Sequence, residues 1–108
     1  MTVAEMASRL ALTPVSAAES EREVTGGYTG DLLSWVMGRA QPGDAWVTIM
    51  SNNNIVAVAT LADTAAVILA EGVTLEPDVV ELARTKGVNI YGSEEDAFAL
   101  CGKIAALL

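Results

Sequence analysis

A chain of 108 residues with a net charge of −8 and no histidine is long enough for one compact domain but lacks several groups that catalysis commonly uses. Its excess of acidic side chains repels nucleic-acid phosphates and anionic lipid, and no run of Lys or Arg offsets it, so binding to nucleic acid or to a membrane is disfavoured. The absence of histidine removes the commonest general base and the imidazole metal sites. We therefore expect no catalytic residues, no metal site and no cofactor.

The cysteine content and the hydrophobic pattern indicate a cytoplasmic protein. The single cysteine, Cys101, has no partner for a disulfide within the chain. No apolar stretch is long enough to span a membrane, and the first residues lack the features of a signal peptide. Because Cys101 falls on the apolar face of a predicted helix, we interpret it as a small buried hydrophobic residue.

The first predicted element is a helix over 2–10. Thr2 and Glu5 have the spacing of a capping box, in which each side chain accepts a hydrogen bond from a free backbone N–H at the helix start. Pro14 closes the helical region. A short strand is predicted over 15–18.

Three glycines within five positions, Gly26, Gly27 and Gly30, mark the most unusual stretch of the chain. They predict a sharp backbone turn or a close approach of the backbone to another group. Thr29 or Asp31 then has the position and the side chain needed to cap the next helix.

The helix after the glycines has a predicted buried face made by Leu32, Leu33 and Val36. Trp35 lies outside this apolar stripe, so we expect it to be partly exposed or at an interface. Gly38 is placed to end the helix in a left-handed conformation.

The middle of the chain predicts a turn over 41–44 and a strand over 45–50. The segment 55–62 contains residues that favour a strand and others that favour a helix. We choose a helix capped by Asn54, because a cleaner strand follows over 65–69.

The last third of the chain has clear boundary signals. Gly72 turns the chain, and Pro77 starts a helix that Gly87 terminates. A strand over 88–91 and a final helix capped by Ser93 complete the chain. On that helix the apolar residues fall on one face: Ala97, Leu100, Cys101, Ile104 and Leu108.

Apolar strands that alternate with helices imply parallel pairing with right-handed crossovers and helices on both faces of the sheet. We therefore predict a single domain over residues 1–108. Its fold class is α/β, a three-layer α/β/α arrangement around a mostly parallel central sheet.

The sequence Glu-Val-Thr-Gly-Gly over 23–27 resembles the motif Asp-Arg-Thr-Gly-Gly, for which the DRTGG domain is named. Similarity in order and spacing continues over nearly the whole chain, in segments 26–34, 65–72, 75–77 and 83–88. Glu23 and Val24 stand where the family has Asp-Arg, although Arg22 and Glu23 supply similar charges in a shifted order. By this resemblance the chain is similar to stand-alone DRTGG proteins.

The resemblance implies a fold similar to the N-terminal domain of HPr kinase/phosphorylase, without the phosphate-binding loop of the kinase. DRTGG domains accompany CBS domains in regulated pyrophosphatases, and stand-alone members tend to be encoded near iron-only hydrogenase and signalling genes. The resemblance therefore implies a non-catalytic regulatory module that forms a homodimer or binds a protein of a redox or signalling system. It supplies no catalytic residues.

The alternative function is that of a small-molecule sensor for an adenine nucleotide or a similar ligand, by analogy with the CBS-linked relatives. The glycines precede a helix start as in a phosphate site, but no Lys-Ser or Lys-Thr follows, and Asp31 would oppose an anion. Polar residues after the strand over 45–50 would complete the pocket, since ligands of open α/β sheets bind at the carboxyl ends of strands. The candidate ligand-binding residues are Thr25, Gly26, Gly27, Thr29, Thr48, Asn52 and Asn54, and the candidate interface residues are Tyr28 and Trp35.

Overall fold

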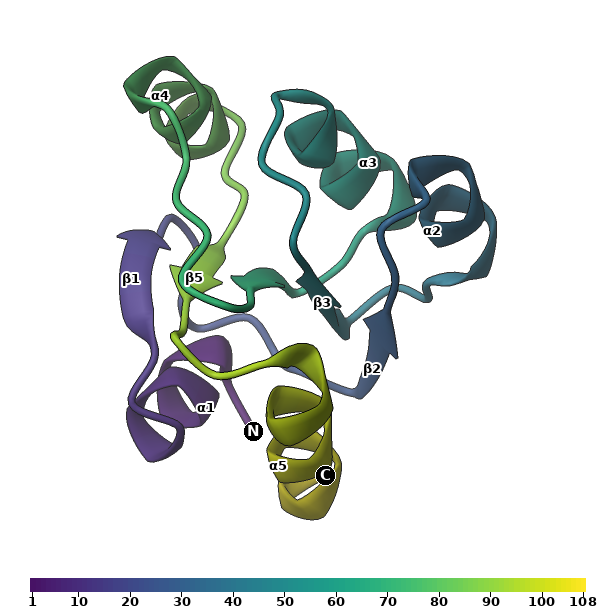
Figure 1. Cartoon of the computed structure of the whole chain (residues 1–108), viewed down its shortest axis with the longest axis vertical. Coiled ribbons are helices and arrows are strands. Elements are labelled where there is room, and N and C mark those ends of the chain that lie inside the picture. Colours follow the sequence, from purple (N-terminus) through teal and green to yellow (C-terminus); the bar gives the residue numbers. More distant parts are fainter.

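A computed structural model describes residues 1–108 as five helices around one five-stranded sheet (Figure 1). The helices are α1 (Val3–Arg9), α2 (Leu33–Arg39), α3 (Asn54–Ala62), α4 (Pro77–Thr85) and α5 (Ala97–Leu107). The strands are β1 (Thr13–Ser16), β2 (Gly26–Thr29), β3 (Asp44–Thr48), β4 (Ala66–Leu69) and β5 (Ile90–Gly92). The predicted α/β class is confirmed.

The sheet has the strand order β1-β5-β4-β3-β2. Strands β2 to β5 pair in parallel, whereas β1 pairs with β5 in the antiparallel direction. The sheet is therefore mixed and mostly parallel, as predicted. Pro14 is tolerated in β1 because that strand forms an edge of the sheet, where a missing backbone donor is not needed for pairing on the outer side. The opposite edge is β2.

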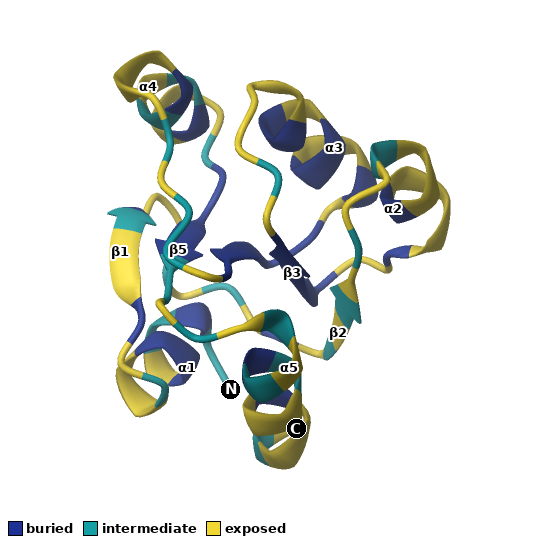
Figure 2. Ribbon diagram, in the orientation of Figure 1, coloured by how far each residue is buried: buried dark blue, intermediate teal, exposed yellow.

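The two faces of the sheet carry separate hydrophobic cores (Figures 1 and 2). Helices α1 and α5 cover one face, and α2, α3 and α4 cover the other. Because neighbouring residues of a strand point to opposite faces, Trp46 belongs to the core on the side of α2 and α3, and Val47 belongs to the core on the side of α1 and α5. Both residues are buried.

Several predicted boundaries are confirmed by backbone geometry. Pro77 is the first residue of α4. Gly72 and Gly87 each turn the chain with a φ of +71°, a conformation that favours glycine. The helix chosen for the ambiguous segment is α3. It ends at Ala62 and is followed by the C-cap residue Asp63, which has a left-handed conformation with a φ of 59°.

The capping box at the start of α1 is confirmed. Thr2 Oγ1 accepts a hydrogen bond from the Glu5 backbone N–H at 3.1 Å, and Glu5 Oε1 accepts one from the Thr2 backbone N–H at 3.2 Å. The hydrogen bond that the Glu5 carboxylate accepts from the Thr2 backbone N–H is the main cause that lowers the pKa of Glu5 from its ordinary value, and the Thr2 side chain lowers it further.

We expect the contribution of this capping box to stability to disappear in acid. A carboxyl group whose pKa is lowered by folding stabilises the fold at pH values above its unfolded pKa, and that contribution is lost as the pH falls through the lowered pKa. Glu5→Gln removes the titrating group, so thermal unfolding of this variant should lack that part of the pH dependence. A wild-type Glu5 pKa at its ordinary value, measured by NMR titration, would contradict the prediction.

The start of α2 differs from the expectation. Neither Thr29 nor Asp31 caps it; the N-cap position is Leu32, which provides no side-chain hydrogen bond and is 58% exposed rather than buried. Asp31 Oδ1 instead accepts hydrogen bonds from Thr48 Oγ1 at 2.7 Å and from the Ile49 backbone N–H at 3.0 Å. The carboxylate is thus used by the end of the neighbouring strand.

Three smaller expectations about helix ends are also wrong. Gly38 lies inside α2 and does not end it, since the helix continues to Arg39. Asn54 is the first residue of α3, and its N–H donates to Asn52 Oδ1 at 2.9 Å. Asp96, three residues after Ser93, caps α5 by accepting a hydrogen bond from the Ala99 N–H at 2.8 Å.

Candidate functional site

The glycines at 26 and 27 lie in β2, so the predicted turn at these positions is wrong. Gly26 pairs with Asp44 of β3 and Thr29 pairs with Val47. None of Gly26, Gly27 and Gly30 has a positive φ. Other residue types could therefore adopt the same backbone conformation. The reason for glycine at these positions must lie in the space around them.

Gly26 is the position where the backbone approaches another group closely. A Cβ atom at Gly26 would lie 2.6 Å from Asp44 Oδ1, a buried carboxylate whose other oxygen accepts a hydrogen bond from the Gln41 N–H at 2.8 Å. At Gly27 a Cβ atom would lie 3.6 Å from the Ala45 carbonyl oxygen and 3.9 Å from Ile104 Cγ2, which are ordinary contact distances.

Alanine substitution should separate these two glycines. Gly26→Ala is expected to lower the free energy of unfolding by about 1–3 kcal/mol, because the new methyl group must displace the Asp44 carboxylate. Gly27→Ala is the matched control and should stay within about 0.5 kcal/mol of the wild type. Urea denaturation measures both, and equal losses would show that the contact with Asp44 is not the reason for glycine.

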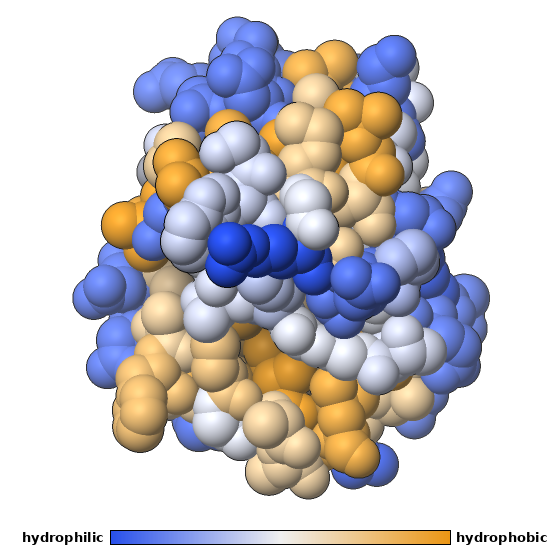
Figure 3. Space-filling model, turned by 90° about the vertical axis from the view of Figure 1, so that its right-hand side faces the viewer, coloured by the Kyte–Doolittle hydropathy of each residue, from blue (hydrophilic) through white to orange (hydrophobic).

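A groove of about 450 Å³ runs between β2 and α5, and none of the side chains of its lining residues is charged. Val47 and Ile104 are buried beneath it. Tyr28 contributes its backbone to the groove, because its half-buried side chain packs against the core on the opposite face of the sheet. Figure 3 views the molecule from the right-hand side of Figure 1. It shows hydrophobic side chains gathered around a hollow in the lower part of the molecule, where β2 and α5 lie. The groove is lined by Thr25, Gly26, Gly27, Tyr28, Thr29, Ala45, Val47, Cys101, Ile104, Ala105 and Leu108.

The structure brings together only part of the predicted ligand site. Thr25, Gly26, Gly27 and Thr29 line the groove, and Tyr28, predicted as an interface residue, lies among them. The other predicted residues, Thr48, Asn52 and Asn54, are outside it.

The alternation of side chains along β3 explains why Thr48 is outside. Val47 faces the groove, whereas Thr48, the next residue, points to the opposite face of the sheet with Trp46. Thr48 is bound to Asp31, and Asn52 accepts from the Asn54 N–H, so these polar groups stabilise the loop after β3. The prediction of one pocket formed by all seven residues is therefore wrong.

Trp35 lies on α2, away from the groove. Its side chain is 52% exposed, which confirms the expected exposure, and the Arg39 guanidinium lies 3.7 Å from the centre of its ring. Such a cation–π contact stabilises an exposed tryptophan by about 0.5–1 kcal/mol. A role of Trp35 at an interface stays a prediction.

The contribution of α5 to the groove was missed by sequence reasoning, which placed one whole face of this helix in the core. Leu100 and Ile104 are buried, but Cys101 is only partly buried and Leu108 is 52% exposed. Because β2 is an edge strand of the sheet and Gly27, the glycine that faces Ile104 of α5, has no side chain, part of that apolar face stays uncovered. No signal in the sequence indicated that the glycine-rich segment forms a strand beside this helix.

Two further features bear on function. No group of three or more Cys, Asp or Glu side chains is placed to hold a metal ion. None of the five helices is both long and apolar enough to cross a membrane.

Known proteins share this sequence pattern and this fold. The family model of the DRTGG domain matches residues 16–107. No curated protein matches the sequence. Among solved structures, the chain is similar to the CBS and DRTGG domains of the regulatory region of Clostridium perfringens pyrophosphatase, complexed with its activator diadenosine tetraphosphate. The TM-score is 0.74 at 14% sequence identity, over 95% of this chain and 45% of that chain.

The chain thus spans less than half of that neighbour, and at this identity the likeness concerns the fold alone. It agrees with the mostly parallel sheet predicted from the sequence. The likeness to the N-terminal domain of HPr kinase/phosphorylase stays a prediction.

Proposed function

Because this chain belongs to the DRTGG domain family, we propose that it is a non-catalytic regulatory module that acts by contact and forms a homodimer through the β2–α5 groove. The observation that carries this proposal is an uncharged groove beside an edge strand, on a chain whose net charge is −8. The similar domain of the pyrophosphatase belongs to a regulatory region, which supports a regulatory role.

Charge favours a second copy of the chain at this groove. Two molecules of charge −8 repel each other over most of their surfaces, and the repulsion is smallest where the contact region has no charged residue. In a two-fold dimer the same patch meets itself, so an uncharged patch meets an uncharged patch.

The edge of β2 adds a specific means of association. An edge strand presents a row of backbone N–H and C=O groups that pair readily with another strand. Gly26 and Gly27 have no side chains that would hold a second backbone at a distance.

A charge placed in the groove should break the dimer. Ala105 is an exposed residue of α5 that lines the groove, and its neighbour Ala106 is exposed and does not line it. Ala105→Glu is expected to raise the dimer dissociation constant at least about tenfold, since the interface would bury an unpaired carboxylate. Ala106→Glu adds the same charge to the same helix and should leave the dimer intact.

Sedimentation equilibrium at micromolar concentrations measures both variants. A wild-type chain that remains a monomer would overturn the proposal, as would equal dissociation of the two variants. Circular dichroism shows whether each variant is folded, so that loss of the dimer is not confused with loss of the fold.

The second candidate function is the sensing of an adenine nucleotide. It is favoured by the neighbouring structure, whose regulatory region is complexed with diadenosine tetraphosphate. The groove volume of about 450 Å³ lies within the range of about 300–1,000 Å³ that is usual for ligand sites. Against it, the groove offers no Lys or Arg to a chain of phosphates, so binding would depend on the adenine ring alone.

Thermal unfolding with ATP and with diadenosine tetraphosphate tests this candidate. A ligand at 100 times its dissociation constant stabilises the folded state by about 2.7 kcal/mol. Stabilisation that Ala105→Glu abolishes would support a nucleotide in the groove. No stabilisation by either nucleotide would remove this candidate and leave the dimer proposal untouched.

A protein partner from a redox or signalling system and a link to hydrogenase stay predictions of the family resemblance. A cytoplasmic location stays a prediction of the cysteine content and the hydrophobic pattern. A partner protein would compete with the second copy for the same groove, and Ala105→Glu would weaken both contacts.

A further inference from the structure

The most exposed large apolar side chain of the protein is that of Phe98, the second residue of α5, which is 91% exposed. Apolar residues scattered singly over a surface are common, but Phe98 is not isolated. Residues three and seven positions apart lie on one face of a helix, so Phe98 shares a face of α5 with Cys101 and Ala105. Both of these line the β2–α5 groove, and the apolar surface therefore continues beyond the groove to Phe98.

Phe98 lies past one end of the groove. Helix α5 follows the carboxyl end of β5, which is parallel to β2 through the intervening strands, so α5 runs back towards the amino end of β2. Halfway along, a Cβ atom at Gly27 would lie 3.9 Å from Ile104 Cγ2. Phe98 is thus on the side of the carboxyl end of β2. Leu108, ten residues later and about 15 Å further along the helix, is at the opposite end of the groove.

The groove has room for an aromatic ring from another molecule. Its volume is about 450 Å³, whereas a cavity of about 150 Å³ is enough to hold benzene. Phe98 does not line the groove of its own chain. Because no lining side chain is charged, a ring that enters the groove strips water from no ionised group.

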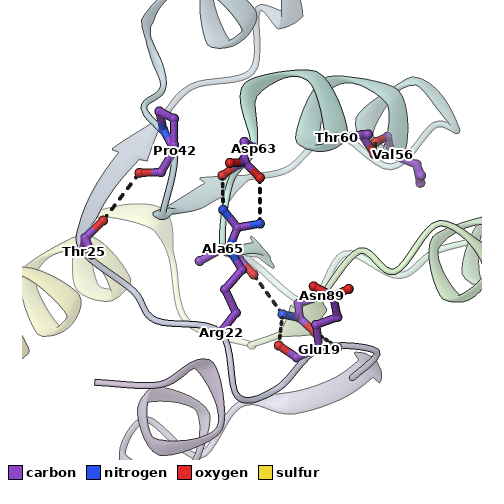
Figure 4. A network of polar contacts seen from close by, with 9 residues as sticks. All are labelled: Glu19, Arg22, Thr25, Pro42, Val56, Thr60, Asp63, Ala65 and Asn89. Carbon is purple, nitrogen blue, oxygen red and sulfur yellow. Dashed lines mark hydrogen bonds and ion pairs between the residues drawn. The ribbon is translucent and has the colours of Figure 1, made fainter.

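The end of the groove at the start of β2 is fixed by hydrogen bonds. Thr25 Oγ1 donates to the Pro42 carbonyl oxygen at 3.5 Å, and the Thr25 N–H donates to the Gly43 carbonyl oxygen at 3.0 Å (Figure 4). Arg22, three residues earlier, pairs with the Asp63 carboxylate at 2.8 Å. This end is therefore preorganised in the single chain, which lowers the entropy cost of binding a side chain there.

We propose that Phe98 of each copy packs into the groove of the other copy, at the end near Thr25 and Leu108. This inference rests on the proposed homodimer and adds the residue that fills its groove. Pairing of two identical edge strands about a two-fold axis is antiparallel, so the groove of the second copy runs in the opposite direction. Each Phe98 then lies opposite the Leu108 end of the other groove, and the dimer contains this contact twice.

Phe98→Ala should raise the dimer dissociation constant at least about tenfold, because an aromatic side chain that fills a pocket contributes strongly to an interface. In solutions dilute enough for the chain to be a monomer, its unfolding temperature should equal that of the wild type, since Phe98 is exposed in the single chain. Leu61→Ala is the matched control. It shortens an apolar side chain of α3 that is 70% exposed and outside the groove, and it should leave the dissociation constant unchanged. Sedimentation equilibrium measures all three chains.

Nuclear Overhauser effects locate the ring of Phe98. In a mixture of ¹³C-labelled and unlabelled chains, isotope-filtered spectra record only the contacts between copies. The chain has one phenylalanine, so its ring protons are assigned without ambiguity. They should show contacts with the methyl groups of Leu108 of the other copy.

A dimer that Ala105→Glu breaks and Phe98→Ala leaves unchanged would overturn this inference while the proposed homodimer stands. Equal weakening by Phe98→Ala and Leu61→Ala would have the same meaning, as would a dimer without contacts between the Phe98 ring and the other copy. A wild-type chain that remains a monomer would overturn the homodimer and this inference together.

Discussion

Replacing Trp46 with alanine is expected to lower the free energy of unfolding by about 3–5 kcal/mol, the range observed when a buried aromatic side chain is deleted. Trp46 is fully buried in β3, in the core that also contains Val36 of α2 and Ile55 of α3. Its indole N–H donates to the Gly30 carbonyl oxygen at 2.9 Å. Deletion therefore opens a cavity and leaves that carbonyl without its partner.

The loss is large because small domains are stable by only about 5–15 kcal/mol. Urea denaturation followed by far-UV circular dichroism measures it without relying on tryptophan fluorescence. Trp46→Phe keeps an aromatic ring but loses the hydrogen bond to Gly30 and part of the indole volume, so the expected loss of stability is smaller than that of the alanine variant.

Trp35→Ala is the matched control, because Trp35 is the other tryptophan and is 52% exposed. It removes the contact with Arg39, and the expected loss is about 0.5–1 kcal/mol. A loss for Trp35→Ala as large as that for Trp46→Ala would mean that the assignment of Trp46 to the core and Trp35 to the surface is wrong.

Replacing Asn89 with leucine is expected to lower the free energy of unfolding by roughly 2–4 kcal/mol, because it leaves several backbone groups unpaired in a region of low exposure. The amide of Asn89 forms three hydrogen bonds, two with the backbone of Glu19 and one with that of Ala65. It therefore ties the segment after β1 to the start of β4. Leucine has a similar size and supplies none of these bonds.

Urea denaturation measures the loss, and hydrogen exchange locates it, since the Glu19 N–H should exchange much faster in the variant. Asn53→Ala is the control: Asn53 is exposed and its side chain forms no hydrogen bond with the protein, so a change of no more than about 0.5 kcal/mol is expected. Unchanged stability of Asn89→Leu would show that water replaces the amide at no cost.

Features that depend on residues close together in the chain were predictable. The capping box of Thr2 and Glu5, the start of α4 at Pro77 and the helix end at Gly87 each involve groups within one turn of a helix. The alternation of apolar strands with helices predicted the mostly parallel sheet, because a strand buried on both faces has few polar positions.

The glycine-rich stretch shows where this reasoning ends. Glycine suits both a turn and a strand that runs close to another group, and the choice at Gly26 depends on Asp44, eighteen residues away in the chain. In the same way Asp31 had the right position to cap α2, but Thr48 and Ile49 bind its carboxylate. Local propensity does not include such competing partners.

The sequence by itself determined the order of the helices and of the strands other than β2, the mostly parallel sheet and the lack of histidine chemistry, because these follow from composition and from contacts between near neighbours. Only the tertiary structure decided that β2 lies at an edge beside α5, which leaves an uncharged groove between them. It also left the Thr64 hydroxyl without a partner. Both results depend on which distant segments pack together, and that is set by the summed burial of the whole chain.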